Sequence, residues 1–422
     1  MRFAASALAD WKGWPRNVRL FFLSNMLYQF GTGLFSVLYN LYIHELGYAD
    51  AMSGTVVSMQ SLATALCFLP IGLFGDRVSR RRMLMIGALG SGILLTCRSL
   101  LESESSLLIL AVLTGLFATA FQVLAIPFLA DNVAKSERLR IFSIYSAFVL
   151  ASQVAGSLSG GVVSDLLHYA GFSEVLSLKL VLLAGGIATL FAYLPLQTMR
   201  NSNFQRTEVS TDVTLTSAPP QQQAREPREL GFILKFAAVQ LIIGIGSGLV
   251  VPYLNLYFTN RFEVSLSGMS LLLALGQVMT ILSMLIGPTL ANRIGQVKAI
   301  VVFQTLSLPF LLLTGFTNLL LVASISFLFR QALMNAANPL VSATLMDRVS
   351  PAKQSLANSC IQTAFMLGWA TMGPVQAYIV STHGYYRGYA ITFSITGALY
   401  VTASILIFLM FRERTKKDRM MA

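Results

Sequence analysis

The sequence is poor in the residues on which enzymes and soluble proteins depend. Charged side chains make up 11% of its 422 residues, and it contains three histidines and three cysteines. The histidines lie far apart in the chain, and the cysteines fall in apolar segments, where thiols usually serve as small packing residues. These residues are His44, His168, His383, Cys67, Cys97 and Cys360. We therefore predict no disulfide framework, metal site, cofactor or catalytic residue, and no enzyme activity.

Apolar residues are abundant instead. They make up 55% of the chain, and the mean hydropathy is +0.67. A bilayer core requires about 20 apolar residues per helix, and on that basis we predict an all-α membrane protein with twelve spans. The first span is long enough to cross the bilayer, so no cleavable signal peptide is expected. The spans cover roughly residues 18–43, 52–74, 83–101, 106–130, 141–166, 177–198, 230–258, 266–290, 298–317, 319–346, 355–380 and 387–411.

A twelve-residue stretch occurs twice. Residues 31–42 recur without a gap as residues 246–257, which lie 215 positions later, and six of the twelve positions are identical. Both copies lie in long apolar segments, so we predict two pseudo-symmetric six-helix bundles built from one duplicated unit. Internally repeated membrane folds are typical of transporters that rock one half against the other. This repeat indicates movement of a solute rather than its chemical alteration.

A polar segment, residues 199–229, separates the two halves. It is rich in Ser, Thr, Gln and charged residues and has almost no apolar periodicity. We therefore predict a flexible cytoplasmic linker rather than a small folded domain. The predicted domains are an N-terminal half (1–198), the linker (199–229) and a C-terminal half with a basic tail (230–422).

Basic residues gather in the N-terminal segment, the loops after the second and fourth spans, the linker and the tail. Cytoplasmic loops are rich in Lys and Arg, so we predict both termini on the cytoplasmic side of a plasma membrane, such as the bacterial inner membrane. The opposite loops hold Arg98, Lys179, Arg261 and Arg387. This bias explains the net charge of +12 through contact with anionic lipid, and no nucleic-acid partner is expected.

The loop between the second and third spans contains a recognisable motif, residues 72–82, with the sequence Gly-Leu-Phe-Gly-Asp-Arg-Val-Ser-Arg-Arg-Arg. It resembles the signature of the major facilitator superfamily, which has Gly, three residues, Asp-Arg, one residue, Gly, and then two basic residues. Ser79 stands where the family has Gly. The matching residues are Gly72, Asp76, Arg77, Arg80 and Arg81. With the twelve spans, the repeat and the linker, the resemblance covers essentially the whole chain.

The resemblance implies a gating role for this motif. Asp76 would accept hydrogen bonds from the free N–H groups at the start of span eleven, a favourable place for an anion. Arg80 would pair with an acid at the end of span four, where Asp131 stands. A solvated ion pair of this kind contributes under about 1 kcal/mol, but a contact that exists in only one state shifts the equilibrium between states. The second half has Asn292 in place of the acid, so we expect a weaker latch there.

Two further motifs bear on transport. Residues 156–161, Gly-Ser-Leu-Ser-Gly-Gly, resemble a motif of the family's antiporters, with Ser157 in place of a proline. Small residues at this spacing also simply allow helices to pack closely, so the motif favours export only slightly. Gly373-Pro374 in span eleven predicts a local kink.

One charge, Arg330, is predicted deep in the bilayer, in span ten. A charge at mid-bilayer costs about 3 kcal/mol or more, so such residues are usually functional. No acid occurs at a comparable depth in any predicted span. An uncompensated guanidinium suits a carboxylate, phosphate or sulfonate on a ligand. The alternative is an arginine that joins helices through hydrogen bonds to carbonyl groups.

Glutamine recurs near the middle of many spans and can both donate and accept hydrogen bonds, so it can line a wet, neutral path. In the superfamily, spans one, two, four and five and their second-half partners line the path, which selects part of this set. A single glutamine can also merely bond across helices. The predicted cavity residues are Arg330, Gln331, Gln29, Gln60, Gln122, Gln153, Gln240, Gln277 and Asn335.

We therefore expect a monomeric secondary active transporter of a small organic solute, most similar to the efflux branch and coupled to protons. Coupling has the weakest basis, because no mid-membrane carboxylate is predicted, and Asp131 or another acid at a helix end would carry the proton. The alternative is a symporter or facilitator of a small organic anion recognised by Arg330. A nontransporting receptor with this fold is disfavoured by the intact latch motif.

Overall fold

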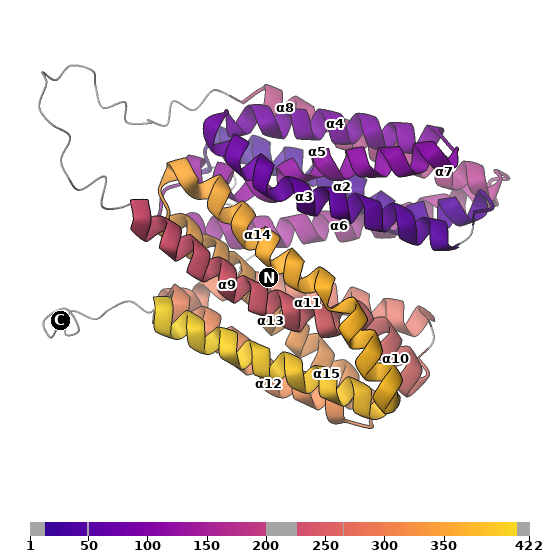
Figure 1. Ribbon diagram of the computed structural model, residues 1–422. Helices are drawn as coiled ribbons and strands as arrows, with labels where there is room; N and C mark the ends of the chain where they lie inside the picture. Colours follow the sequence, from indigo (N-terminus) through magenta and orange to yellow (C-terminus); the bar gives the residue numbers. More distant parts are fainter. Residues whose placement is uncertain (1–12, 49, 200–225, 265, 412–422) are drawn as a thin grey trace, which may run out of the picture. The chain divides into compact units, whose positions relative to one another are not determined.

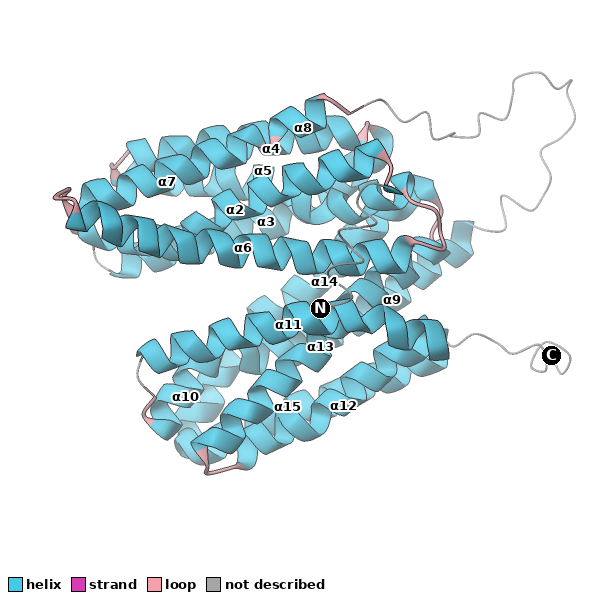
Figure 2. Ribbon diagram, turned by 180° about the vertical axis from the view of Figure 1, so that it is seen from behind, coloured by secondary structure: helices cyan, strands magenta, loops and turns pink. Residues whose placement is uncertain are grey.

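The computed structural model describes residues 13–48, 50–199, 226–264 and 266–411, and these residues are almost entirely helical, with no strand among them (Figure 2). The N-terminal part contains α2 (Arg16–Glu45), α3 (Asp50–Arg77), α4 (Arg80–Leu100), α5 (Glu104–Asn132), α6 (Arg138–Tyr169), α7 (Glu174–Phe191) and α8 (Tyr193–Gln197). The C-terminal part contains α9 (Glu226–Val250), α10 (Leu254–Phe262), α11 (Leu266–Ile294), α12 (Gln296–Phe316), α13 (Leu320–Arg348), α14 (Gln354–Thr371) and α15 (Gly373–Phe411) (Figure 1). Most of the predicted linker lies outside the described residues.

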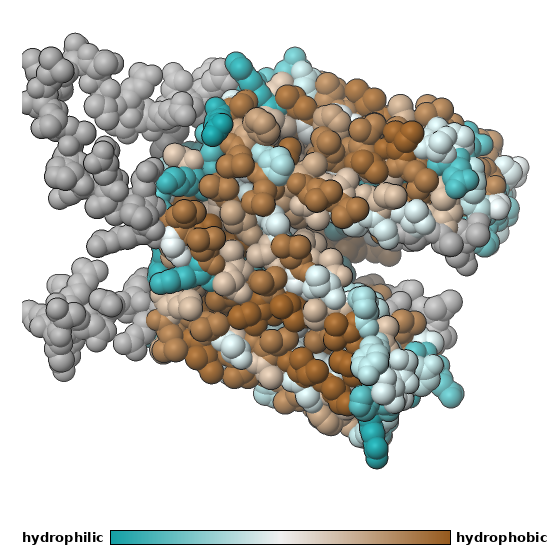
Figure 3. Space-filling view, in the orientation of Figure 1, coloured by the Kyte–Doolittle hydropathy of each residue, from teal (hydrophilic) through white to brown (hydrophobic). Residues whose placement is uncertain are grey.

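The helices are long and apolar enough to form a membrane protein. Ten segments among the described residues meet the length and hydropathy expected of a span, and one of them, Pro351–Phe411, is a run of 61 residues. Gly384 divides that run, since its φ of 74° and ψ of 168° are not helical. With this division and the 30-residue helix α2, twelve spans result, as predicted. Apolar side chains cover the long sides of the helices, and polar side chains collect at their ends (Figure 3).

The chain forms two compact units. Unit 1 comprises residues 1–223 and 349–359, and unit 2 comprises residues 224–348 and 360–422. Helix α14 therefore begins in unit 1 and ends in unit 2. In unit 1, α2 packs on α6 and α7. Helix α4 packs on α5 and α7, and α5 also packs on α3. In unit 2, α9 likewise packs on α14 and α15. Helix α12 packs on α13 and α15, and α13 also packs on α11. The pseudo-symmetry predicted from the repeat is thus present in the helix packing.

The repeated glycines explain why the duplicated stretch kept its sequence. A β-carbon at Gly33 would overlap the carbonyl oxygen of Gln153 in α6, and one at Gly248, 215 positions later, would overlap that of Trp369 in α14. The other glycine of each pair, Gly31 or Gly246, packs closely on α7 or α15. Only glycine lets two helix backbones come this close. The repeat therefore preserves the crossing of the first helix in each unit.

The repeated tyrosines also have matching contacts. Tyr42 donates a hydrogen bond to the carbonyl oxygen of Ser99 at 3.4 Å, and Tyr257 donates one to that of Thr314. Ser99 and Thr314 are also 215 positions apart. Each tyrosine is buried and ties the first span of its unit, α2 or α9 with α10, to the end of the third span, α4 or α12. Buried tyrosine hydroxyls usually have such partners, and the hydroxyl of Tyr42 also reaches the carboxylate of Glu102 at 3.2 Å.

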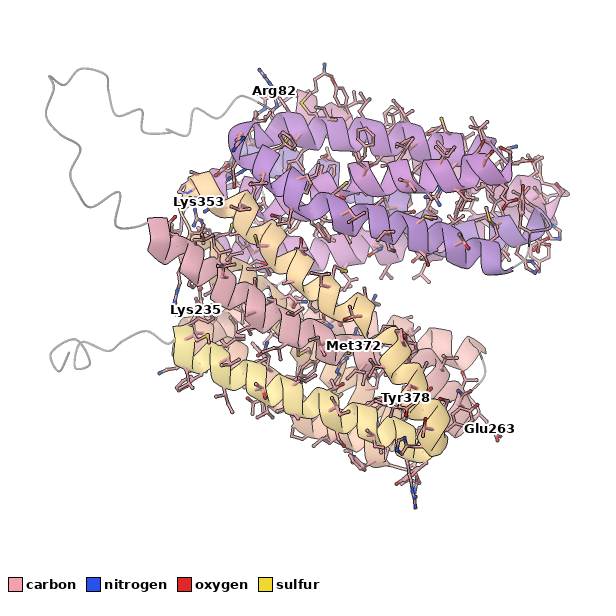
Figure 4. All side chains as sticks on the ribbon, viewed as in Figure 1. Arg82, Lys235, Glu263, Lys353, Met372 and Tyr378 are labelled. Atoms are coloured by element: carbon pink, nitrogen blue, oxygen red, sulfur yellow. The ribbon has the colours of Figure 1, made fainter. Side chains whose placement is uncertain are left out.

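The second unit has two breaks that the first unit lacks. The predicted span 230–258 is interrupted at Val251–Tyr253, a short 3₁₀ turn around Pro252, after which α10 continues. Val37 stands at the matching place in α2, which is continuous, so the break coincides with a proline, which has no N–H to donate, that the first unit lacks there. The chain breaks again at Met372, beside the Gly373-Pro374 pair, between α14 and α15 (Figure 4).

Candidate functional site

Asp76 lies at the end of α3 and accepts three hydrogen bonds. Its two carboxylate oxygens accept from the backbone N–H groups of Ser355 at 3.0 Å and Leu356 at 2.8 Å, in the first turn of α14. The first N–H groups of a helix have no partner within the helix, and its dipole favours an anion there. Asp76 therefore caps α14, and because residues 349–359 belong to unit 1, this contact is internal to that unit.

Arg80 connects the same carboxylate to α5. Its guanidinium donates to Asp76 at 2.9 Å and to Asp131 at 2.6 Å, and Arg80 is 9% exposed. It also donates to the hydroxyl of Ser355 at 3.0 Å and to the carbonyl oxygens of Pro351 at 2.6 Å and Pro127 at 3.2 Å. The start of α14 is thus held by a network of charged groups from α3, α4 and α5. Hydrogen bonds that involve ionised groups are stronger than neutral ones, so the network favours one position of this helix end.

Close packing reinforces the network. A β-carbon at Gly72 would overlap the side chain of Ser359 on α14, so glycine is required for this approach. Asn358 donates a hydrogen bond to the carbonyl oxygen of Val123 at 2.8 Å, which adds a contact between α14 and α5. Asn358 was not predicted as a site residue, because an isolated amide in a span carries no distinctive pattern.

The other two arginines of the motif have different positions. Arg77 is exposed at the end of α3. Arg81 donates to the carbonyl oxygens of Leu196 at 2.9 Å and Gln197 at 2.7 Å, at the end of α8. Cations at helix C-termini satisfy the free carbonyl groups there. Arg81 therefore joins α4 to α8.

Arg330 is buried in α13 with 4% of its surface exposed. Its guanidinium donates to the hydroxyl of Tyr400 at 3.0 Å and to the side-chain oxygen of Gln331 at 3.4 Å. The Tyr400 hydroxyl also lies 2.7 Å from that of Ser247. Within the described part of the chain, no carboxylate lies within ion-pair distance of Arg330, and its Nε is buried without a partner. The site is therefore a cation held by neutral groups, with an unfilled donor.

The predicted glutamines are in different environments. Gln153, Gln240 and Gln277 are half-buried, and their side chains form no hydrogen bond with other described residues. Gln29 and Gln60 accept hydrogen bonds from Thr32 and Arg98. Gln122 is exposed on α5, and Asn335 donates to the carbonyl oxygen of Gln331 one turn earlier. Arg330, Gln331 and Asn335 thus form one local group in unit 2.

Arg98 differs most from its expected position. It was expected among the loop cations, but it lies in the last turn of α4 and is 3% exposed. Its guanidinium lies 4.0 Å from the ring centre of Tyr39 and donates to Gln60 at 2.7 Å. Hydropathy cannot indicate which face of a helix end a residue occupies, so this burial was not predictable from the span alone.

Glu102, one turn beyond Arg98, has partners of its own. Lys179 donates to its carboxylate at 2.7 Å and Tyr42 donates at 3.2 Å. The hydrogen bond from Lys179 is the main reason that the pKa of Glu102 lies below its ordinary value, against a smaller opposing effect of partial burial. Glu102 therefore stays ionised at neutral pH.

Sequence comparisons agree with this architecture. The family model of the Major Facilitator Superfamily matches the chain twice, over residues 21–235 and 236–420. The multidrug resistance protein MdtG of Proteus mirabilis is 25% identical over 410 residues, which cover 94% of both chains. MdtG of Erwinia billingiae is 30% identical over 155 residues, which cover 36% of this chain and 38% of that relative.

Solved structures show the same fold. The fucose–proton symporter FucP of E. coli has a TM-score of 0.72 at 14% identity, over 94% of this chain and 98% of that one. The human organic anion transporter MFSD10 has a TM-score of 0.67 at 16% identity, over 93% and 99%. The two family matches correspond to the two halves of the internal repeat. The chain belongs to the Major Facilitator Superfamily and is a multi-pass membrane transporter, not an enzyme.

Proposed function

We propose that this transporter exports a small organic solute by alternating access and that proton entry drives the export. The observation that carries the proposal is the contact of Asp76 with the first turn of α14. Since α14 begins in unit 1 and continues into unit 2, breaking that contact frees a helix that belongs to both units. A contact made in only one state biases the equilibrium by its differential energy.

Export is the direction that the relatives favour. The MdtG proteins are named for multidrug resistance, and the full-length match to the Proteus protein supports a similar role here. The small-residue motif at 156–161 adds slight support. Asp131 is our candidate for the proton-binding group, because it is 33% exposed and its partner Arg80 also bonds Asp76. Protonation of Asp131 would weaken that ion pair and so loosen the network around α14.

A pH gradient across proteoliposomes tests the coupling. The purified protein is reconstituted, and efflux of a solute found by thermal-shift screening is followed with and without the gradient. A bound solute at 100 times its dissociation constant should stabilise the protein by about 2.7 kcal/mol, which makes such a screen sensitive. We expect the gradient to accelerate efflux and Asp131→Asn to abolish the acceleration. Efflux that is indifferent to the gradient would remove proton coupling from the proposal.

A second candidate function is symport or facilitated transport of a small organic anion. It is favoured by Arg330, a buried cation without an acidic partner among the described residues and with an unfilled donor. The arginine fork matches carboxylate and phosphate groups in shape and charge. Charge selectivity separates the two candidates. Preference for anionic solutes supports the second, whereas an amphipathic cation as best substrate would exclude Arg330 from recognition.

A further inference from the structure

Unit 1 contains a second buried arginine without an acid beside it. Arg98 is 3% exposed, and among the described residues its five N–H donors form one hydrogen bond, to Gln60. Its Nε is buried and has no partner. Glu102, the nearby acid, is bonded to Lys179 and Tyr42 instead. A buried charge is normally paired, so the missing counter-charge indicates an anionic ligand.

Tyr39 supplies an independent observation. Its side chain is 3% exposed, and its hydroxyl is buried without a hydrogen-bond partner. Buried tyrosine hydroxyls usually have partners. The ring of Tyr39 already stacks on the Arg98 guanidinium at 4.0 Å. This stacking fixes the plane of the guanidinium and leaves the N–H donors at its edge uncovered. A tyrosine hydroxyl and guanidinium N–H groups that lack hydrogen-bond partners among the described residues thus occur in one cluster.

The cluster is also within reach of the surface. Arg98 lies in the last turn of α4, which ends at Leu100, and residues 101–105 beyond it are exposed. Gln60 on α3 and Tyr39 on α2 hold the arginine from two other helices. The free donors of Arg98 therefore lie at a helix end that is followed directly by exposed residues.

We propose that Arg98, Tyr39 and Gln60 form an anion-binding site in unit 1, separate from Arg330, that takes one carboxylate or phosphate group. Arg98 supplies the charge and a planar fork, and Tyr39 supplies a hydroxyl donor. Gln60 orients the fork by accepting from one of its N–H groups. The site goes beyond the transport function proposed above and does not depend on its direction or coupling. The anionic group comes from a free inorganic ion or from a transported solute.

Thermal shifts of the purified full chain test the site. Sodium acetate and sodium phosphate are compared with sodium chloride at equal ionic strength, because the fork geometry favours oxyanions over a halide. We expect the wild type to show an oxyanion-specific increase in melting temperature. Arg98→Gln should lose that increase, and Tyr39→Phe should weaken apparent affinity roughly tenfold, the effect of one hydrogen bond to a charged group.

The controls distinguish a ligand site from a structural contact. Tyr28→Phe removes a hydroxyl from the same helix, but one that lies 3.2 Å from the hydroxyl of Ser91, so it should lower stability and keep the oxyanion effect. Arg330→Gln removes the other buried guanidinium and should keep the part of the oxyanion effect that Arg98→Gln loses. If Tyr39→Phe leaves the oxyanion effect unchanged, or if only Arg330→Gln abolishes it, the proposal is overturned. The Tyr39→Phe variant therefore tests the proposal even if Arg98→Gln fails to fold.

A competition arm identifies the source of the anion. An anionic solute from the thermal-shift screen is added at saturating phosphate, with Arg98→Gln as the reference. Competition that disappears in the variant assigns the site to the anionic group of the solute. Additive stabilisation assigns it to a free inorganic ion. Equal competition in both proteins places the shared site elsewhere and contradicts the proposal.

Discussion

The Arg330 guanidinium donates to the hydroxyl of Tyr400 at 3.0 Å, and this neutral phenol is its shortest side-chain contact. Because Tyr400 also contacts Ser247, the tyrosine keeps a partner when the arginine is removed. Arg330→Ala therefore leaves no buried acid and no unpaired tyrosine behind. An effect of Arg330→Ala on solute binding can therefore be measured apart from an effect on the stability of the fold.

We predict that Arg330→Ala lowers solute affinity at least tenfold, the loss of a charge-assisted hydrogen bond, and changes unfolding free energy by less than about 1 kcal/mol. Arg330→Lys should rescue binding poorly, since an ammonium cannot reproduce the planar fork. Ligand binding and detergent stability are measured on the same preparations. Clear destabilisation with unchanged affinity would assign Arg330 to helix packing and leave the glutamines as candidates for selectivity.

Asp76→Asn should release the start of α14. The amide can accept from one of the two N–H groups but offers the other a donor, so about 1.5–3 kcal/mol of charge-assisted bonding is at stake. We expect the distance distribution between spin labels at Ser79, two residues beyond the end of α3, and Ala352, two residues before the start of α14, to broaden towards longer distances.

The same measurement applies to the ion pair. Arg80→Ala should act in the same direction as Asp76→Asn, and Arg80→Ala with Asp131→Ala should be less than additive, because the residues are in contact. Unchanged distance distributions in both single variants would refute the latch, and full additivity would show that the pair is not coupled.

The glycine pair of the repeat gives a matched stability test. Gly33→Ala and Gly248→Ala should each destabilise their unit by about 1–3 kcal/mol, because the new methyl group overlaps a backbone carbonyl. Gly161→Ala is the control, since its β-carbon would meet nothing within 4 Å and alanine is the better helix former. Thermal unfolding of the three variants measures the difference. A loss of stability in the control equal to that of the pair would contradict this explanation of the repeat.

Glu102 should make a small contribution to stability that depends on pH. Its pKa is lowered in the folded state, chiefly by Lys179, so the contribution is present above the unfolded pKa and is lost as pH falls through the folded pKa. Both side chains are partly exposed, which limits the pair to below about 1 kcal/mol. We expect Glu102→Gln to melt below the wild type at pH 7, with the difference shrinking towards pH 3. A constant difference over this range would exclude the ion pair as its cause.

Much of the fold was predictable because hydropathy, the repeat and the charged motif are local patterns. The helix break at Pro252 was not, because Pro70, Pro127, Pro288 and Pro309 lie inside continuous helices and only packing distinguishes them. The burial of Arg98 likewise depends on which faces of α2 and α3 are turned towards it, and hydropathy does not indicate this. The partners of Arg330 could not be named in advance, since Tyr400 is 70 residues away.

Counterflow in proteoliposomes tests the central claim most directly. Liposomes are preloaded with an unlabelled solute from the screen, and uptake of the labelled solute is followed without any ion gradient. Alternating access predicts transient accumulation of label above equilibrium, dependent on the preload and strongly reduced in Arg330→Ala. Uptake that only equilibrates, or no uptake above protein-free liposomes, would contradict the account.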